Sequence, residues 1–323
     1  MRTILYSTWE PGLTGNTKSS GGGAAWTKYL WDFLETNGYS IVAPGITNPD
    51  SVEPTQPVDA AIFCWRWLLP DAPQYKERNL LYDRQNYLIG WCFENAIPVV
   101  IHDQDLKMLS VEREWLKKNG AIIATPSLFP ETGEISLHFP NPYEFEPLIQ
   151  GSTGLTYIGN NYERLDQTFK LIEPFAHEVH TTFYGNWIEP GYDRDPSVIK
   201  GLLPNVHFMG RLPQEDVITT LRKAKATVML HKPEYGPRGF VTIRWAEAAS
   251  AGVLPFIPAE FNLPNQYIYS LSRLRVSESA EMLEAYNQIG ENERKKLIYQ
   301  LRRFVVHYMS PVPWIKLLER IIV

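Results

Sequence analysis

Residues 228–258 read VMLHKPEYGPRGFVTIRWAEAASAGVLPFIP, and this stretch decides the fold class of the chain. Alternating β-branched and apolar side chains predict a strand over residues 226–230. Two prolines and a glycine break the pattern over residues 231–238. Apolar positions at helical spacing then predict a helix over residues 239–251, ended by Gly252, and a strand over residues 253–257. A strand, loop, helix and strand in this order indicate an α/β protein.

Several polar residues fall on or near the first two turns of the predicted helix: Arg238, Thr242, Arg244 and Glu247. The helix starts at the carboxyl end of a strand, where open α/β sheets bind ligands and where free N–H groups favour phosphate. Glu247 lies two turns from the helix start, where a carboxylate is suited to accept hydrogen bonds from sugar hydroxyls. Together these features predict a nucleotide diphosphate site. The alternative is an ordinary helix–strand unit with a surface glutamate.

The same stretch resembles the donor-binding segment of GT-B glycosyltransferases. The resemblance lies in EAASAG at residues 247–252 and LPF at residues 254–256. Many of these enzymes carry a second glutamate eight residues upstream, where this chain has Gly239. The resemblance is therefore to variants with a single ribose-binding acid, and it implies that Glu247 binds the ribose.

The size and composition of the chain suit two globular domains in a reducing compartment. There are 323 residues, 44% of them hydrophobic, and the net charge is −5, so nucleic-acid binding would need a local basic patch. The two cysteines, Cys64 and Cys92, have apolar neighbours and indicate buried thiols. The sequence shows neither a signal-peptide pattern nor an apolar run of membrane-spanning length. We expect a cytoplasmic monomer without a membrane span, in the host cytoplasm if the source is a phage.

Strands and helices alternate in two successive runs along the chain. The first run predicts strands at residues 3–7, 39–43, 59–65, 98–101 and 121–125, with helices at 24–37, 80–95 and 111–119. The second predicts strands at residues 155–158, 179–184 and 206–209 before the opening stretch, and helices at 214–224, 279–289 and 291–308. We expect an α/β fold of two Rossmann-like doubly wound domains, residues 1–150 and 151–308, facing a central cleft. By the GT-B resemblance, a helix at residues 309–323 would cross back to the first domain.

We expect the donor-binding residues to follow strands of the second domain. Asparagine and arginine side chains after the strand at residues 155–158 suit a diphosphate, and the loop at residues 210–212 resembles the GT-B loop that reads the nucleotide base. A glycine-rich helix start in the first domain would also admit phosphate or sugar. The donor-binding set is Gly22, Gly159, Asn160, Arg164, Gly210, Arg211, Leu212, Arg238, Gly239, Thr242 and Glu247. For each arginine the alternative is a surface salt bridge, and for Gly22 a flexible loop.

The sequence predicts donor binding without an essential metal or other cofactor. In the second domain, no Asp-x-Asp stands at a predicted strand end to hold a metal-bound diphosphate. Arginines would then stabilise the charge of the leaving group.

His102 and Asp103 follow the buried strand of residues 98–101. A partly desolvated carboxylate there can take the proton of an attacking hydroxyl, with His102 orienting it or binding a sugar hydroxyl. We therefore expect Asp103 and His102 to be catalytic, and Asp105, Trp65 and Arg66 to bind the acceptor. The alternative has His102 as a strand cap and Asp103 as a helix N-cap.

A His-Asp pair at this strand end resembles bacteriophage enzymes that glycosylate 5-hydroxymethylpyrimidines in DNA. The short GT-B domains and the single ribose glutamate fit the same resemblance, which implies duplex DNA as a partner. A basic and aromatic set in the first domain suits a phosphate backbone and an extruded base; it comprises Lys18, Lys28, Arg66, Lys76, Arg78 and Arg84, with Trp65, Trp67, Tyr75 and Tyr82. The alternative is a solvated face.

The leading hypothesis is a glycosyltransferase that moves a sugar from a UDP-linked donor, such as UDP-glucose, to a 5-hydroxymethylpyrimidine in DNA. A cell-surface glycan or a small molecule is the alternative acceptor. A non-catalytic two-domain binding protein of periplasmic type is opposed by the arginine-rich loops and the missing signal pattern. A Rossmann dehydrogenase is opposed by the absence of a G-x-G-x-x-G fingerprint.

Overall fold

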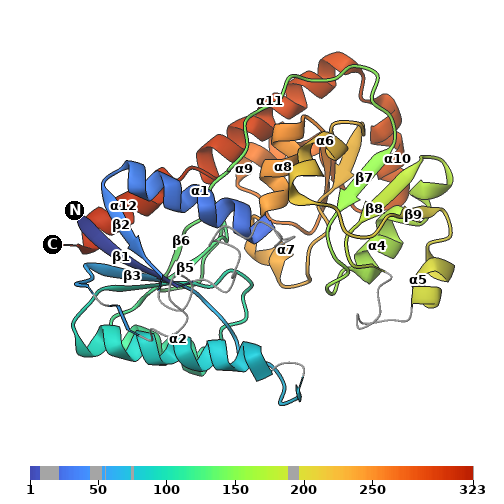
Figure 1. Cartoon of the computed structure of the whole chain (residues 1–323). Coiled ribbons are helices and arrows are strands. Elements are labelled where there is room, and N and C mark those ends of the chain that lie inside the picture. Colours follow the sequence, from blue (N-terminus) through green and yellow to red (C-terminus); the bar gives the residue numbers. More distant parts are fainter. Residues whose placement is uncertain (8–21, 44–52, 55, 74–75, 188–195, 323) are drawn as a thin grey trace. The chain divides into compact units, whose positions relative to one another are not determined.

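A computed structural model describes the chain except for residues 8–21, 44–52, 55, 74–75, 188–195 and 323. The side chains of residues 22–25, 77–78 and 196 are also outside the description. The chain divides into two compact units (Figure 1), which are Met1–Pro140 with Ser310–Val323, called unit 1, and Asn141–Met309, called unit 2. Residues 141–150, expected at the end of the first domain, thus group with unit 2.

Unit 1 is built on six parallel strands in the order β2-β1-β3-β4-β5-β6. They are β1 (Arg2–Ser7), β2 (Tyr39–Val42), β3 (Ala60–Cys64), β4 (Val99–His102), β5 (Ile122–Thr125) and β6 (Glu134–Ser136). The helices are α1 (Gly22–Thr36), α2 (Lys76–Glu94), α3 (Ser110–Lys118) and α12 (Val312–Ile321). In Figure 1, α1 and α12 lie on one face of this sheet and α2 lies on the other.

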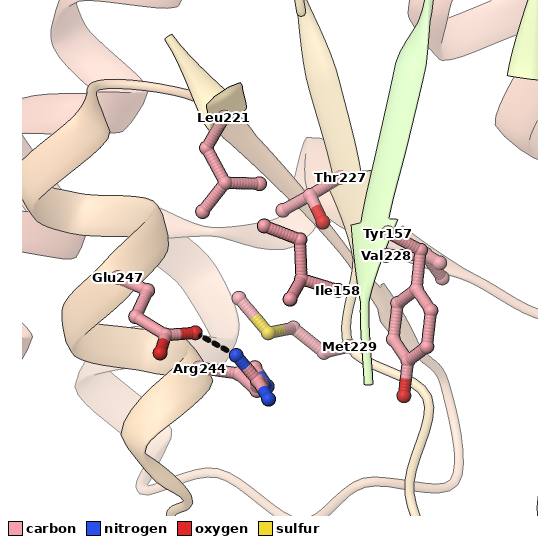
Figure 2. A pocket seen from close by; sticks show the side chains of 8 residues that line it. All are labelled: Tyr157, Ile158, Leu221, Thr227, Val228, Met229, Arg244 and Glu247. Atoms are coloured by element: carbon pink, nitrogen blue, oxygen red, sulfur yellow. Dashed lines mark hydrogen bonds and ion pairs between the residues drawn. The ribbon is translucent and has the colours of Figure 1, made fainter. Parts of the chain in front are cut away.

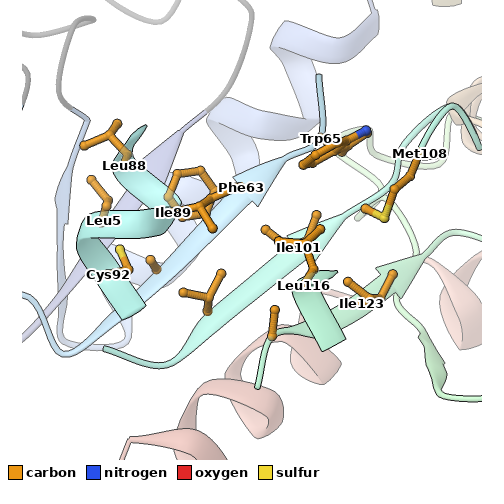
Figure 3. Close-up of a cluster of buried hydrophobic side chains, with 13 residues drawn as sticks. Leu5, Phe63, Trp65, Leu88, Ile89, Cys92, Ile101, Met108, Leu116 and Ile123 are labelled. Carbon is orange, nitrogen blue, oxygen red and sulfur yellow. The ribbon is translucent and has the colours of Figure 1, made fainter. Parts of the chain in front are cut away.

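The core of unit 1 follows from the apolar central strands (Figure 3). Alternate residues of neighbouring strands, such as Leu5, Phe63 and Ile101, point to the face that α2 and α3 cover. These helices contribute Leu88, Ile89, Cys92 and Leu116. Because the parallel strands are buried on both faces, their carboxyl ends are held in fixed register, and the residues that follow them are positioned by the sheet.

Unit 2 repeats the plan with six parallel strands in the order β12-β11-β10-β7-β8-β9. They are β7 (Leu155–Ile158), β8 (Thr181–Tyr184), β9 (Val206–Phe208), β10 (Ala226–Val228), β11 (Leu254–Pro258) and β12 (Arg275–Val276). The chain runs outward from β7 through β8 and β9, then returns to pair β10 with the other side of β7. The point between β7 and β10 is therefore the topological switch point, where such sheets bind ligands.

The larger helices of unit 2 flank this sheet. They are α4 (Leu165–Ile172), α5 (Pro196–Leu202), α6 (Val217–Leu221), α8 (Ile243–Ala251), α9 (Asn265–Ser270), α10 (Ser279–Gln288) and α11 (Glu291–Tyr308). β6 and β12, with three and two residues, were not predicted from the sequence, and neither were α5 and α9.

The helix predicted over residues 239–251 begins later in the structure. A short helix, α7 (Tyr235–Arg238), ends at Gly239, whose φ of 55° is left-handed. The chain is then extended at Thr242, the N-cap residue of α8, and α8 ends at Gly252 with φ 71°. Glycine adopts this conformation without steric cost, so Gly239 can end α7 and Gly252 can end α8. Gly239 and Thr242 thus precede the helix instead of forming its first turn.

Candidate active site

The loops after β7, β8 and β9 are joined by hydrogen bonds. The Gly159 amide donates to Tyr184 O at 2.9 Å, the Gly185 amide to Gly210 O at 2.7 Å, and the Trp187 indole to Gly159 O at 2.6 Å. Gly185 has φ +120°, and a Cβ there would lie 2.1 Å from Gly159 O. The close approach of the loops therefore requires glycine at this position.

Side chains extend this network across the same loops. Asn160 Oδ1 accepts the Asn186 amide at 2.8 Å, and Asn186 Oδ1 accepts Arg211 Nε at 2.7 Å. The structure thus brings together Gly159, Asn160, Gly210 and Arg211, four of the residues expected to bind the donor. Leu212 follows them and is half-buried.

Arg164 links the loops on the two sides of the switch point. Its Nη1 donates to Asn160 O at 2.8 Å, after β7, and its Nε donates to Leu230 O at 3.3 Å, after β10. The guanidinium is thereby held at the carboxyl ends of both strands. Arg238 stands at the end of α7 in the segment after β10 and is half-buried.

Arg244 and Glu247 line a pocket between β7, β10 and α8 (Figure 2). The other lining residues are Tyr157, Ile158, Leu221, Thr227, Val228 and Met229. Arg244 Nη1 donates to Glu247 Oε2, and the Glu247 side chain has no exposed surface. The pocket holds about 220 Å³ of empty space including its opening.

Two residues at or beside this pocket, Arg244 and Tyr143, are not among the residues expected to bind the donor. Arg244 was placed on the helix, and its spacing of three residues from Glu247 was the signal that the two side chains share a face. Tyr143 has no such signal, because it lies 104 residues before Glu247. Its hydroxyl is 3.5 Å from Glu247 Oε1.

His102 ends β4 in a closed aromatic environment of unit 1. Its side chain is fully buried, with Trp26, Phe139 and Trp314 around the ring. Burial lowers the pKa of His102 to about 3, so the ring is neutral at pH 7, and Nε2 lies 2.8 Å from Leu137 O. The His102 ring has no exposed surface in this structure.

Asp103 accepts hydrogen bonds from the loop that follows it. Its carboxylate oxygens lie 3.1 Å from the Lys107 amide and 3.4 Å from the Met108 amide, and Arg113 is 3.5 Å away. Burial raises the pKa of Asp103 to about 6, although the two amides and Arg113 act in the opposite direction. A carboxyl with this pKa can accept a proton near neutral pH.

The loop after Asp103 is under backbone strain. Leu106 has φ 53°, a left-handed conformation that costs a non-glycine residue roughly 1 kcal/mol or more. Asp105 lies in this loop and is half-buried, so it is more accessible than Asp103, which is only 1% exposed. Asp103 does not cap α3, which begins after Leu109.

The expected acceptor residues after β3 take different positions. Trp65 is 2% exposed and packs in the unit 1 core against Tyr82, so the expectation that its ring faces the acceptor is not met in this structure. The reason is that β3 continues its buried pattern by one residue. Arg66 is half-buried, and its backbone is held on both sides by the buried Gln85 side chain, at 2.8 and 3.2 Å.

The remaining first-domain predictions can be placed only in part. Gly22 begins α1, but its surroundings are outside the described chain. Of the basic and aromatic set, Lys18 and Tyr75 and the side chain of Arg78 are also outside it. Lys28 is exposed and pairs with Asp32 at 2.6 Å.

Across the residues that the structure describes, no group of three or more His, Cys, Asp or Glu side chains is arranged to hold a metal ion. In the same residues, no helix combines the length and apolar character needed to cross a membrane.

The comparisons with known proteins show what this chain is similar to. Residues 167–318 match the family model described as glycosyl transferase-like. Two parallel six-stranded sheets flanked by helices match solved GT-B glycosyltransferase structures, so the fold predicted from the sequence is confirmed. Among curated proteins, none matches the sequence significantly.

One of the similar solved structures is a phage enzyme, and its similarity extends over the whole chain. The beta-glucosyltransferase of T4 phage in complex with UDP and Mn²⁺ matches with a TM-score of 0.68 and 14% identity, over 100% of this chain and 99% of that one. The same enzyme with its UDP-glucose substrate matches with a TM-score of 0.64 and 14% identity over the same shares. AviGT4, a glycosyltransferase of avilamycin A biosynthesis, matches with a TM-score of 0.54 and 13% identity, over 100% and 98%.

Proposed function

We propose that this protein is a glycosyltransferase that moves a sugar from a nucleotide diphosphate donor to a hydroxyl acceptor. The observation that carries the proposal is the Arg244–Glu247 pair, which lines a pocket at the switch point of unit 2. The pair offers a cation for phosphate and a carboxylate for sugar hydroxyls within one turn of α8. The glycosyl transferase-like match over residues 167–318 supports the same activity.

The donor site is proposed to divide its tasks among unit 2 loops. Glu247 accepts hydrogen bonds from the ribose hydroxyls at the pocket that it lines. Arg164, Arg238 and Arg244 bind the diphosphate beside the loop at Gly159 and Asn160, and residues 210–212 contact the base. Guanidinium groups bond phosphate oxygens in pairs and oppose the charge that grows on the leaving diphosphate.

UDP-glucose is the proposed donor, without an essential metal. Structures of the T4 phage enzyme contain UDP-glucose, which supports this nucleotide and sugar. One of them contains Mn²⁺ with UDP, so metal independence is a separate prediction, and the three arginines are the groups proposed to replace a metal.

The proposed acceptor is a 5-hydroxymethylpyrimidine in DNA. Its hydroxyl oxygen attacks the anomeric carbon, the bond from that carbon to the diphosphate oxygen breaks, and UDP leaves. The acceptor proton goes to a carboxylate of unit 1. Asp103 is the proposed base because its pKa is raised to about 6, with His102 positioning it and Arg66 and Asp105 contacting the acceptor. The similarity to a beta-glucosyltransferase described as a DNA modifying enzyme supports DNA as the acceptor.

There is one alternative for the catalytic base and one for the acceptor. Asp105 is the alternative base because it is more exposed than Asp103. The similarity to AviGT4 favours a small molecule as the second candidate acceptor.

Transfer of radiolabelled glucose from UDP-glucose tests the proposal. Duplex DNA that contains 5-hydroxymethylcytosine should become labelled, and matched unmodified DNA should not, because its bases carry no hydroxymethyl group. Label on neither DNA, together with slow release of UDP from UDP-glucose, would replace the DNA acceptor with a glycan or small molecule. Absence of UDP release and of binding to any common nucleotide sugar would contradict the glycosyltransferase activity itself.

A further inference from the structure

Tyr143 connects the segment that opens unit 2 with the glutamate proposed to bind ribose. Its hydroxyl oxygen lies 3.5 Å from Glu247 Oε1, and it also accepts a hydrogen bond from Gln214 Nε2. The three side chains come from three separate stretches of unit 2. The proposed function assigns no role to Tyr143 or Gln214.

The direction of these hydrogen bonds is fixed by the chemistry of the groups. An amide nitrogen can only donate, so Gln214 occupies a lone pair of the phenol oxygen. The single phenol hydrogen is then left for Glu247, which as a carboxylate can only accept. Burial, with Glu247 next to it, raises the pKa of Tyr143, so this hydrogen is present at all ordinary pH values.

Tyr143 and Arg244 together define the orientation of the Glu247 carboxylate. Tyr143 faces Oε1 and Arg244 donates to Oε2. A carboxylate has about four lone-pair positions, two on each oxygen. One on each oxygen is used within the protein, so one on each remains for a ligand. Two neighbouring acceptors are the match for two neighbouring hydroxyls.

The backbone that carries Tyr143 is held in place. Asn141 bonds both the amide and the carbonyl of Tyr143, each at 3.0 Å. Three residues further on, the Glu146 amide donates to Ser250 O in α8 at 2.9 Å, and Arg222 bonds the Glu146 carboxylate at 2.9 Å. Tyr143 is thus attached at both sides and has little freedom to leave Glu247.

We propose that Tyr143 is a positioning residue that makes Glu247 selective for a ribose diol. This inference rests on the proposed function, because it requires Glu247 to bind the ribose. Tyr143 directs the free lone pairs of Glu247 toward the 2′- and 3′-hydroxyls together. Without the phenol hydrogen the carboxylate can rotate, and the two hydroxyls are no longer bound as a pair.

The test compares two ligands by calorimetric titration: UDP and its 2′,3′-dideoxy analogue. The wild type should bind UDP more tightly, and Glu247→Gln should reduce the ratio of the two dissociation constants toward one. Tyr143→Phe should lower the ratio roughly tenfold, the usual effect of a hydrogen bond to a charged group. Gln214→Leu, which frees the phenol to turn, should lower it less. Tyr269→Phe, at a tyrosine that is 80% exposed, is the matched control and should leave it unchanged.

The ratio separates positioning from a merely structural effect. A structural defect weakens both ligands equally and leaves the ratio at its wild-type value. If Tyr143→Phe does this while Glu247→Gln abolishes the preference, the inference about Tyr143 is overturned and the ribose assignment stands. If the wild type itself shows no preference for UDP, the ribose assignment fails and the inference fails with it.

Discussion

At the scale of single residues, two carboxylates of unit 1 are proposed to activate the acceptor. Asp103 has a raised pKa, which suits a base, but almost no exposed surface, whereas Asp105 is half-buried. Comparing their asparagine variants separates the two roles, because asparagine keeps the shape and removes the ionisable group.

We expect Asp103→Asn to reduce kcat about 10²–10⁴-fold, the usual contribution of a general base, with donor binding unchanged. In the wild type, kcat/KM should rise through pH 6, because a base acts only when deprotonated, and then level off. Asp105→Asn is the comparison and should lose less of the rate, because Asp105 is proposed only to contact the acceptor. The reverse result, with the larger loss in Asp105→Asn, would assign the base to Asp105.

The stability of Asp103→Asn distinguishes catalysis from a structural role. Because burial raises the folded-state pKa from 3.8 to about 6, the stability that Asp103 contributes is present below pH 3.8 and is lost as pH rises through 6. By linkage this amounts to about 3 kcal/mol. At pH 7 the neutral asparagine should therefore not lower the free energy of unfolding. A marked loss there, measured by urea denaturation, would indicate that the carboxylate mainly holds its loop.

His102 should make the protein sensitive to acid. Its pKa falls from 6.5 to about 3 on folding, so the folded state binds fewer protons, and stability is lost as pH falls below 6.5, by about 1.4 kcal/mol per pH unit. Asp103 opposes this below pH 6. We therefore expect urea denaturation of Asp103→Asn to show a loss of about 2 kcal/mol between pH 6.5 and 5. In the double variant His102→Phe with Asp103→Asn this loss of unfolding free energy should be absent. An equal loss in the double variant would show that His102 is not its cause.

At the scale of elements, the loops around the switch point are proposed to stabilise the leaving diphosphate. Arg164 is fixed by carbonyls on both sides of that point, and Arg238 ends α7 nearby. We expect Arg164→Ala and Arg238→Ala each to lower kcat more than they weaken donor binding, because the charge on the leaving group grows toward the transition state. Arg273→Ala, at a side chain that is 48% exposed, is the control.

The same arginines predict activity without a metal. Turnover in EDTA should equal turnover in buffer alone, and added Mn²⁺ should change it little. A complete loss of turnover in EDTA that Mn²⁺ restores would show that a metal holds the diphosphate. Near-normal kcat in both arginine variants would support the same correction.

Most of the helices and strands could be predicted from the sequence, because buried parallel strands appear as short apolar runs between helices. The start of α8 could not be predicted, because the helical spacing of apolar residues continues through Phe240, whereas Gly239 adopts a left-handed conformation. The two- and three-residue strands are too short to show a period. The Tyr143–Glu247 contact joins residues 104 apart, so only the folded chain reveals it. No pattern in the sequence indicated that Trp65, one residue beyond β3, packs in the core of unit 1.

At the scale of the whole molecule, the net charge of −5 requires any DNA contact to come from a local set of cations. We expect binding of hydroxymethylated duplex DNA to weaken as salt rises, because cations that contact phosphates release counterions. Fluorescence anisotropy at several salt concentrations measures the slope. Arg66→Ala should reduce both affinity and slope, whereas a slope near zero would exclude contact with the phosphate backbone.

The central claim is that unit 2 binds a nucleotide sugar through Glu247, and titration of UDP-glucose into wild type and Glu247→Ala tests it most directly. A buried hydrogen bond to a charged group contributes about 1.5–3 kcal/mol, so the dissociation constant should rise roughly tenfold or more. Thermal unfolding without ligand should remain cooperative in both proteins. At 100 times its dissociation constant, UDP-glucose should add about 2.7 kcal/mol to the stability of the wild type. An unchanged dissociation constant in Glu247→Ala would contradict the account.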